Sequence, residues 1–166
     1  MCIRDRSLTG PTYVLHWNGR RWSRSDFPRQ RAPGYPFGLI ATGPNDMWTT
    51  WVLAKNLTAP YLLHWTGSHW TKVGFPKGGS GAPAAGDGSG GLWLNGFASG
   101  KKRVQLFLHW SAGHWKLWQV PQKGWEPGNV DYLALIPGTT SVWATGNVYG
   151  PGDGTTLNRG AIWRYS

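Results

Sequence analysis

Short stretches of apolar and aromatic residues alternate along the chain with clusters of glycine, proline and asparagine. In one region, such stretches cover 37–42, 47–54, 61–65 and 69–75. Stretches of this length, rich in aromatic residues and bounded by turn residues, are typical of β-strands. With 25 Gly, 12 Pro and 13 Trp among 166 residues, we predict an all-β protein made of short strands and frequent turns.

A pattern with two tryptophans occurs three times in the chain. Its copies are YVLHWNGRRW at 13–22, YLLHWTGSHW at 61–70 and LFLHWSAGHW at 106–115, and a degenerate copy, GAIWRY, is assigned to 160–165. Glycine between the two tryptophans supplies the positive φ that a tight hairpin needs, so the halves of each copy are predicted to pair as antiparallel strands. The first tryptophans of the four copies are 48, 45 and 53 residues apart, at Trp17, Trp65, Trp110 and Trp163.

Two further landmarks keep the same order along the chain. NDMW at 45–48, GGLW at 90–93 and TSVW at 140–143 precede the second, third and fourth copies. Phe-Pro or Val-Pro follows the first, second and third copies, at 27–28, 75–76 and 120–121. Three landmarks with one period indicate an internal repeat. The tryptophans at repeat positions are predicted to be structural, and they are Trp17, Trp22, Trp48, Trp65, Trp70, Trp93, Trp110, Trp115, Trp143 and Trp163.

The repeating unit has the size of one β-propeller blade. A blade is a four-stranded antiparallel sheet of roughly 40–50 residues that buries its faces against neighbouring blades. Tryptophan side chains, which bury about 150–250 Å² each, would fill those contacts. We predict a partial β-propeller of about three blades. Its parts are the last two strands of a blade in 8–30, full blades in 31–77 and 78–122, and the first three strands of a final blade in 123–166.

These motifs resemble the repeats of exported, Trp-rich β-propeller proteins that are best represented in actinobacteria. The family pattern L-x-H-W-x-G-x-x-W, followed by D-V-W-A-V-G, is matched by LHWTGSHW at 63–70 and VWATG at 142–146. The resemblance covers nearly all of 13–165 and implies a propeller that is secreted or held at the cell surface. It departs at Ala112, where the glycine moves to Gly113, and at Trp51, which stands where a glycine is expected. It implies a fold more firmly than a function.

The first residues are not expected to belong to the natural protein. MCIRDR at 1–6 looks like a translated sequencing adapter, so 1–7 is set apart from the fold. The natural N-terminus, any signal peptide and several blades are then expected to be missing, and the single cysteine, Cys2, to be spurious. A chain without other cysteines has no disulfide framework. No run of about 18 apolar residues is present, so no transmembrane helix is predicted.

Histidines and carboxylates are the residues from which a catalytic or metal site would be built. All five histidines stand directly before a repeat tryptophan, so we expect them to be hydrogen-bonded on separate strands and not to converge on a metal ion. We see no pair of carboxylates in a pattern typical of a glycosidase. We therefore predict no catalytic residue, metal or cofactor. The carboxylates outside 1–7 are Asp26, Asp46, Asp87, Glu126, Asp131 and Asp153.

Three tryptophans have no counterpart in the other repeats, namely Trp51, Trp118 and Trp125. Each is a candidate for stacking on a ligand such as a sugar ring. For Trp125, which lies in a predicted loop, capping of a neighbouring blade is the alternative. The basic run Lys101, Lys102 and Arg103 is a candidate for contact with an anion, with plain solvation as the alternative.

Three functions are compatible with these features. The first is a non-catalytic binding or scaffolding propeller, extracellular, that contacts a glycan or a protein. The second is a propeller glycosidase or lyase whose active site lies on missing blades. The third is a binder of nucleic acid or an anionic surface, favoured by the net charge of +10. We place it last because the basic residues are scattered. The ligand and the oligomeric state stay open.

Overall fold

A computed structural model describes residues 12–27, 33–54, 60–98, 104–121, 126–150 and 158–165. These residues form thirteen strands and no helix, which confirms the all-β prediction for this part of the chain. Within the same ranges, no helix is long and apolar enough to cross a membrane.

The strands form four antiparallel sheets that follow one another along the chain. The first sheet has two strands, the second and third have four each, and the fourth has three, and within each sheet the strands lie side by side in chain order. The strands are β1 (Tyr13–Trp17) and β2 (Trp22–Asp26); β3 (Gly34–Gly43), β4 (Asp46–Leu53), β5 (Tyr61–Trp65) and β6 (Trp70–Val73); β7 (Gly79–Gly86), β8 (Leu92–Ala98), β9 (Val104–Ser111) and β10 (His114–Gln119); β11 (Glu126–Leu135), β12 (Val142–Tyr149) and β13 (Asn158–Tyr165).

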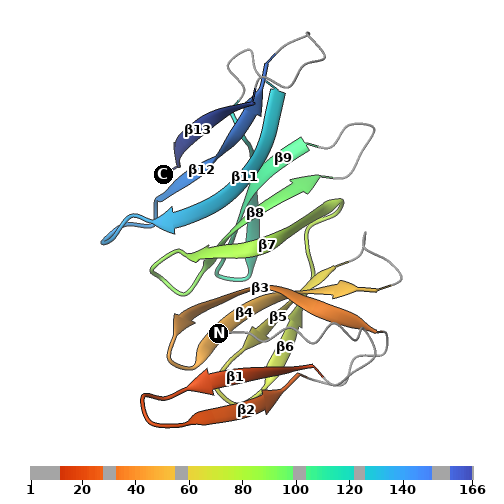
Figure 1. Cartoon of the computed structure of the whole chain (residues 1–166), viewed down its shortest axis with the longest axis vertical. Helices are drawn as coiled ribbons and strands as arrows, with labels where there is room; N and C mark the ends of the chain where they lie inside the picture. The colour runs from red at the N-terminus through yellow and green to blue at the C-terminus, as the bar shows by residue number, and fades with distance from the viewer. Residues whose placement is uncertain are drawn as a thin grey trace.

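The four sheets are stacked, with β1–β2 at one end and β11–β13 at the other (Figure 1). The first strands of the second, third and fourth sheets are neighbours, since β3 packs against β7 and β7 packs against β11. The stack is open, and its first and last sheets lie far apart in Figure 1. We call the side of a sheet that points to the next sheet along the chain its forward face, and the opposite side its backward face.

The apolar core is divided into three clusters that follow the contacts between sheets. Between the second and third sheets, Trp48 and Leu62 meet leucines of β8 and β9. Between the third and fourth, Trp93 and Phe107 meet Val142 and other residues of β11 and β12. A smaller cluster lies on the backward face of the second sheet and includes Phe27, which follows β2. Because each strand alternates its side chains between two faces, one sheet contributes to two clusters.

Strand register corrects the alignment of the fourth repeat copy. On β4, Trp48 lies opposite the residue that precedes the first tryptophan of its pair. On the last sheet, Trp143 lies opposite Arg164, so Tyr165 occupies the first-tryptophan position. Trp163 stands two positions earlier and packs against the cluster between the third and fourth sheets. The alignment through Trp163 is therefore wrong by two residues, because the stretch on which it was based, 160–165, covers one strand and no hairpin turn.

The glycine that moves from position 112 to 113 changes the type of hairpin turn. Gly19 and Gly67 have φ angles of 92° and 87°, as the first central residue of a type II′ turn does. In the third copy, Ala112 and Gly113 both have positive φ, 49° and 81°, which is the signature of a type I′ turn. Ala112 is therefore an L-residue in a left-handed conformation, which is unfavourable for alanine.

Replacing Ala112 with asparagine is expected to stabilise the protein by about 0.5–1 kcal/mol, because Asn-Gly is the preferred pair in a type I′ turn. Urea unfolding followed by tryptophan fluorescence measures the change. Ala112→Val is the matched control and is expected to destabilise, since a β-branched residue tolerates positive φ poorly. Equal stability of the two variants would show that this turn does not hold its left-handed geometry in solution.

Candidate functional site

The second sheet carries a group of three side chains, which we call an Asp–His–Trp cluster. Asp46 begins β4, Trp48 follows on the same strand, and His64 lies opposite Trp48 on β5. His64 Nε2 is 2.6 Å from Asp46 Oδ1, and the His64 ring stacks on Trp48 with centroids 3.7 Å apart and planes inclined by 7°. The stacked tryptophan is 2% exposed. The carboxylate thus holds the imidazole against the tryptophan ring on the forward face.

The third sheet carries a second Asp–His–Trp cluster with the same stacking. His109 Nε2 is 2.8 Å from Asp87 Oδ2, and the His109 ring stacks on Trp93 with centroids 4.3 Å apart and planes inclined by 7°. Here the carboxylate comes from the loop before β8, and its side chain is 1% exposed, against 33% for Asp46. The prediction of hydrogen-bonded histidines on separate strands is confirmed for His64 and His109.

The Asp87 carboxylate organises the loop between β7 and β8. Its Oδ1 accepts hydrogen bonds from Ser89 N at 2.8 Å, Ser89 Oγ at 2.9 Å and Gly91 N at 2.7 Å, while Oδ2 contacts His109. Burial by itself raises the pKa of Asp87, but the hydrogen bonds from His109, Ser89 and Gly91 together outweigh it and hold the pKa below its usual value. The group is therefore a buried carboxylate that is fully used in structure.

A polar side chain two positions after the clustered tryptophan reaches the next sheet. Thr50 Oγ1 donates to the carbonyl of Gly81 on β7 at 2.8 Å, and Asn95 Nδ2 donates to the carbonyl of Val130 on β11 at 2.9 Å. Trp93 Nε1 adds a third bond of this kind, to the carbonyl of Thr140 at 3.1 Å. We call this combination of a buried tryptophan and the polar residue two positions later the forward joint. It fastens the second sheet to the third and the third sheet to the fourth.

The second tryptophan of the second and third paired motifs makes the complementary contact backward. Trp70 lies 4.8 Å from Phe27, and Trp115 stacks on Phe75 at 5.6 Å, measured between ring centroids. Trp115 Nε1 also donates to the carbonyl of Gly74 at 2.9 Å. The phenylalanines are those of the Phe-Pro landmarks, which end the preceding unit. Tryptophan packing between sheets, as predicted, is thus confirmed for these two residues and for the tryptophans of the Asp–His–Trp clusters.

Trp51 lies in the core, and its ring is not accessible to a ligand. It is 4% exposed and lies 5.6 Å from Phe27, centroid to centroid. Gly34 on β3 makes room for it, since a Cβ at Gly34 would lie 2.5 Å from Trp51 Nε1. The glycine that the repeat lacks on β4 is therefore matched by a glycine on β3. A ligand could stack on Trp51 only if the first and second sheets separated.

Trp118 is partly buried and packs among the aromatic residues of the third and fourth sheets. Its ring lies 5.4 Å from Trp93 and 5.3 Å from Tyr165, between centroids. Stacking of a ligand on Trp118 stays a prediction. The other predicted contact residues, namely Trp125, Lys101, Lys102 and Arg103, lie outside the described residues.

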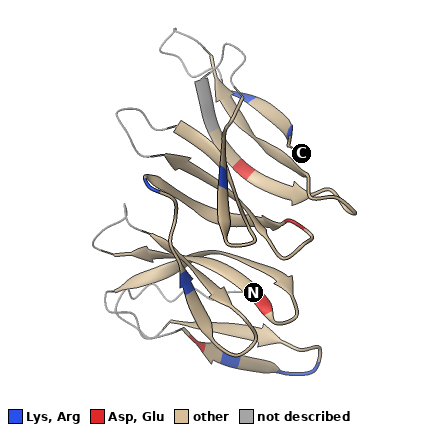
Figure 2. Ribbon diagram, turned by 180° about the vertical axis from the view of Figure 1, so that it is seen from behind, with Lys and Arg blue, Asp and Glu red and all other residues tan. Residues whose placement is uncertain are grey.

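Charged side chains are spread over the stack, as Figure 2 shows. The described basic residues lie in the β1–β2 turn, on β2, β6, β10 and β13, and in the turn before β7, so no single sheet gathers them. Within the described ranges, no three His, Cys, Asp or Glu side chains lie close enough to hold a metal ion. The described charged groups thus form two Asp–His pairs, while the basic side chains are spread over several sheets and turns.

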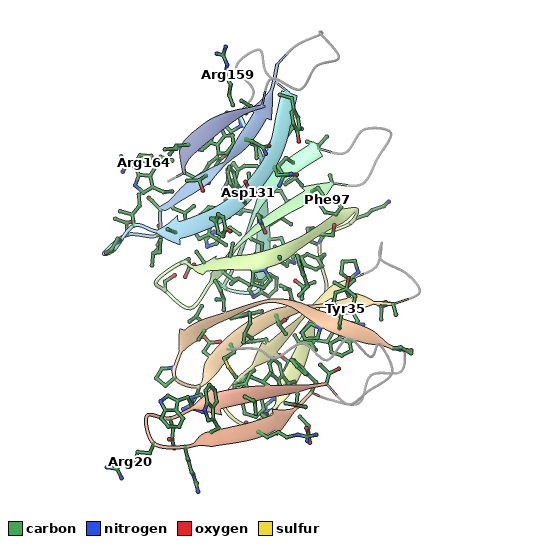
Figure 3. All side chains as sticks on the ribbon, viewed as in Figure 1. Arg20, Tyr35, Phe97, Asp131, Arg159 and Arg164 are labelled. Atoms are coloured by element: carbon green, nitrogen blue, oxygen red, sulfur yellow. The ribbon has the colours of Figure 1, made fainter. Side chains whose placement is uncertain are left out.

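Repeat positions at the two ends of the stack are exposed. Trp143 is 47% exposed, although the equivalent Trp48 and Trp93 are buried. Trp17 and Trp22 are 48% and 51% exposed at the other end, near the turn that carries Arg20 (Figure 3). The equivalent residues of the second and third sheets pack between sheets, but the residues that the structure describes include no further sheet beside β1–β2 or β11–β13.

Sequence reasoning missed the Asp–His bonds. Asp46 was expected to be only a turn residue, and Asp87 only part of a glycine-rich loop. A partial signal was present, because a carboxylate precedes Trp48 and another precedes Trp93, and each of these tryptophans has a histidine opposite it on the next strand. Comparisons of the chain with protein-family models, curated proteins and solved structures found no match. The functional interpretation therefore rests on the repeat geometry.

Proposed function

We propose that this chain is part of a β-propeller whose sheets are blades, and that the propeller is an exported, non-catalytic module that binds or scaffolds a glycan or a protein. The forward joint supports the propeller, because it recurs from the second to the third sheet and from the third to the fourth, with the same residue positions. Repeated units that bury their faces only against neighbours are typical of such architectures. The resemblance to exported Trp-rich repeat proteins supports the location.

The observation that carries the non-catalytic assignment is that the Asp–His pairs are already bonded to other groups of the protein. Asp87 is 1% exposed and accepts bonds from His109, Ser89 and Gly91. A general acid or base must reach a substrate proton within hydrogen-bond distance, and this carboxylate faces the interior of its own loop. His64 is likewise stacked on Trp48 and bound to Asp46. We therefore assign these groups a structural role and expect other, surface-exposed residues to contact the ligand.

A charge-driven function is less well supported by the arrangement of basic residues. Binding to nucleic acid depends on a basic patch or stripe that neutralises several phosphates together. The described Lys and Arg side chains are distributed over several sheets and turns instead (Figure 2). We therefore favour recognition of a glycan or protein, in which a few shaped contacts matter more than net charge.

The test is binding of the folded chain to an array of neutral and acidic glycans, and to cell-envelope proteins in a pulldown, at low and at high salt. We expect saturable binding that persists at high salt, with no cleavage of the bound glycan. Heat-unfolded chain is the control for unspecific contact with exposed aromatic rings. Blank results in both assays would contradict the proposal. Release of cleaved glycan would indicate an enzyme, and binding abolished by salt would indicate a charge-driven binder.

A further inference from the structure

The dipeptide Asn-Gly occurs twice in the chain, at Asn18-Gly19 and at Asn95-Gly96. In this dipeptide the main-chain nitrogen of the glycine can attack the side-chain amide carbon of the asparagine, because glycine has no Cβ to obstruct the approach. The two copies lie in different surroundings, since Asn18-Gly19 is in the turn between β1 and β2 and Asn95-Gly96 is within β8. One molecule therefore contains both a turn and a strand version of the same reactive sequence.

The turn at 18–21 holds the Asn18 side chain by its oxygen. Asn18 Oδ1 accepts hydrogen bonds from the backbone nitrogens of Arg20 and Arg21, each at 3.0 Å. Attack on the amide carbon places negative charge on this oxygen, and N–H donors that already point at it stabilise that charge. Among the described residues, none accepts a hydrogen bond from Asn18 Nδ2. The turn thus binds the atom that gains charge and leaves the departing nitrogen unbound.

The strand version is held in the opposite way. Asn95 Nδ2, the nitrogen that would depart, donates to the carbonyl of Val130 at 2.9 Å. Gly96 is buried and pairs with Gly81 on one side and with Leu106 on the other. The glycine nitrogen can therefore approach the amide carbon only if β8 first opens locally, which costs free energy in a central strand.

Exposure of the turn is a property of the repeat and not of its place in the chain. Asn18, Gly19 and Arg20 are exposed, and Arg20 points away from the molecule (Figure 3). The equivalent turns of the second and third sheets are exposed at 66–69 and 112–114, although sheets lie on both sides of each (Figure 1). Water therefore reaches this turn whether or not neighbouring sheets are present.

We propose that Asn18 is a site of spontaneous deamidation in the folded chain. A bond forms between Gly19 N and Asn18 Cγ while the bond between Cγ and Nδ2 breaks, and Nδ2 leaves as ammonia with the proton from Gly19 N. Water then opens the resulting succinimide ring at one of its two carbonyl carbons. Opening at Cγ gives aspartate at position 18, and opening at the main-chain carbonyl gives isoaspartate.

The two products have different effects on the hairpin. Aspartate keeps an acceptor for Arg20 N and Arg21 N and makes both hydrogen bonds charge-assisted. Isoaspartate adds one methylene group to the main chain of the turn. Because turn length sets the register of a hairpin, we expect this product to disturb the pairing of Trp17 with Trp22. The modification is independent of the glycan or protein binding proposed above.

The test is a time course of the full, folded chain at mildly alkaline pH, followed by mass spectrometry of the tryptic peptides 7–20 and 78–101. Each peptide contains a single asparagine, Asn18 or Asn95. We expect the Asn18 peptide to change from the amide to the acid mass at least about tenfold faster than the Asn95 peptide, because Asn95 must first leave its strand. In urea both peptides should react at similar rates, which verifies that the two sequences have the same intrinsic reactivity.

Asn18→Thr is the matched variant, because threonine occupies the equivalent position of the second copy, at Thr66. It should abolish the mass change in peptide 7–20. Equal rates for the two peptides in the folded chain would overturn the inference, as would a mass change that persists in Asn18→Thr. Slower reaction of Asn18 in the folded chain than in urea would also overturn it, since the turn would then protect the side chain. Each of these results leaves glycan or protein binding unaffected.

Discussion

Replacing Trp93 with alanine is expected to lower the free energy of unfolding by about 3–5 kcal/mol, the usual cost of truncating a buried tryptophan. Trp93 is 3% exposed, stacks on His109 and donates its indole N–H to the carbonyl of Thr140 on the following sheet. The substitution opens a cavity between two sheets and leaves that carbonyl without its partner. Urea unfolding at low protein concentration, followed by circular dichroism, measures the loss.

Trp143→Ala is the matched control, because Trp143 has the same repeat position but is 47% exposed on the end face. It should cost less than about 1 kcal/mol, as a substitution away from buried features does. The difference between the two variants measures the contribution of the covering sheet. If the two substitutions cost the same, the fourth sheet does not pack over Trp93 as described.

Replacing Asp87 with alanine is expected to destabilise the protein by about 3–5 kcal/mol, since it leaves buried donors without their charged acceptor. The donors are the backbone N–H groups of Ser89 and Gly91, with the ring of His109 in addition. Asp46→Ala removes the equivalent carboxylate, which is one-third exposed and contacts His64. That control should cost about 1 kcal/mol. A larger loss for Asp46→Ala than for Asp87→Ala would contradict these different roles.

The loss of stability at acid pH gives an independent measure of how far folding lowers the pKa of Asp87. Its pKa is lower in the folded chain than the usual value, which is about 3.9 in an unfolded chain. Between these two pKa values the unfolded state binds more protons, so stability is complete above the unfolded pKa and is lost as pH falls through the folded pKa. Asp87→Asn should therefore show a shallower loss of stability below about pH 4 than the natural chain. An unchanged slope would mean that folding does not shift the pKa of Asp87, and it would contradict the lowered pKa.

The strands and hairpins could be predicted because similar copies of one motif occur in the same chain and can be aligned with each other. The paired-tryptophan copies around Trp17, Trp65 and Trp110 mark the outer hairpins of three sheets, and the structure forms each of them. The fourth copy was misplaced at Trp163 because it was aligned on a single strand, without a turn to set the register. A local pattern fixes a hairpin only when both strands and the turn are present.

The joints could be predicted only in part, because they depend on pairs of residues far apart in the chain. Asp87 and His109 are 22 residues apart, and Asp87 is farther from its tryptophan than Asp46 is, so the two carboxylates do not align in the sequence. Trp51 attracted a ligand-stacking hypothesis because it breaks the pattern of β4. Its compensation is Gly34, on another strand, and only the sheet register reveals that the two positions meet.

The most direct test of stacked sheets with a repeated joint is a nuclear Overhauser measurement across the contact between the third and fourth sheets. The indole N–H of Trp93 should show contacts with protons of Thr140, and the side-chain amide of Asn95 should show contacts with protons of Val130, as the hydrogen bonds require. Contacts of Trp93 with His109 alone, with neither inter-sheet contact present in the folded chain, would contradict the forward joint and the stack that is built on it.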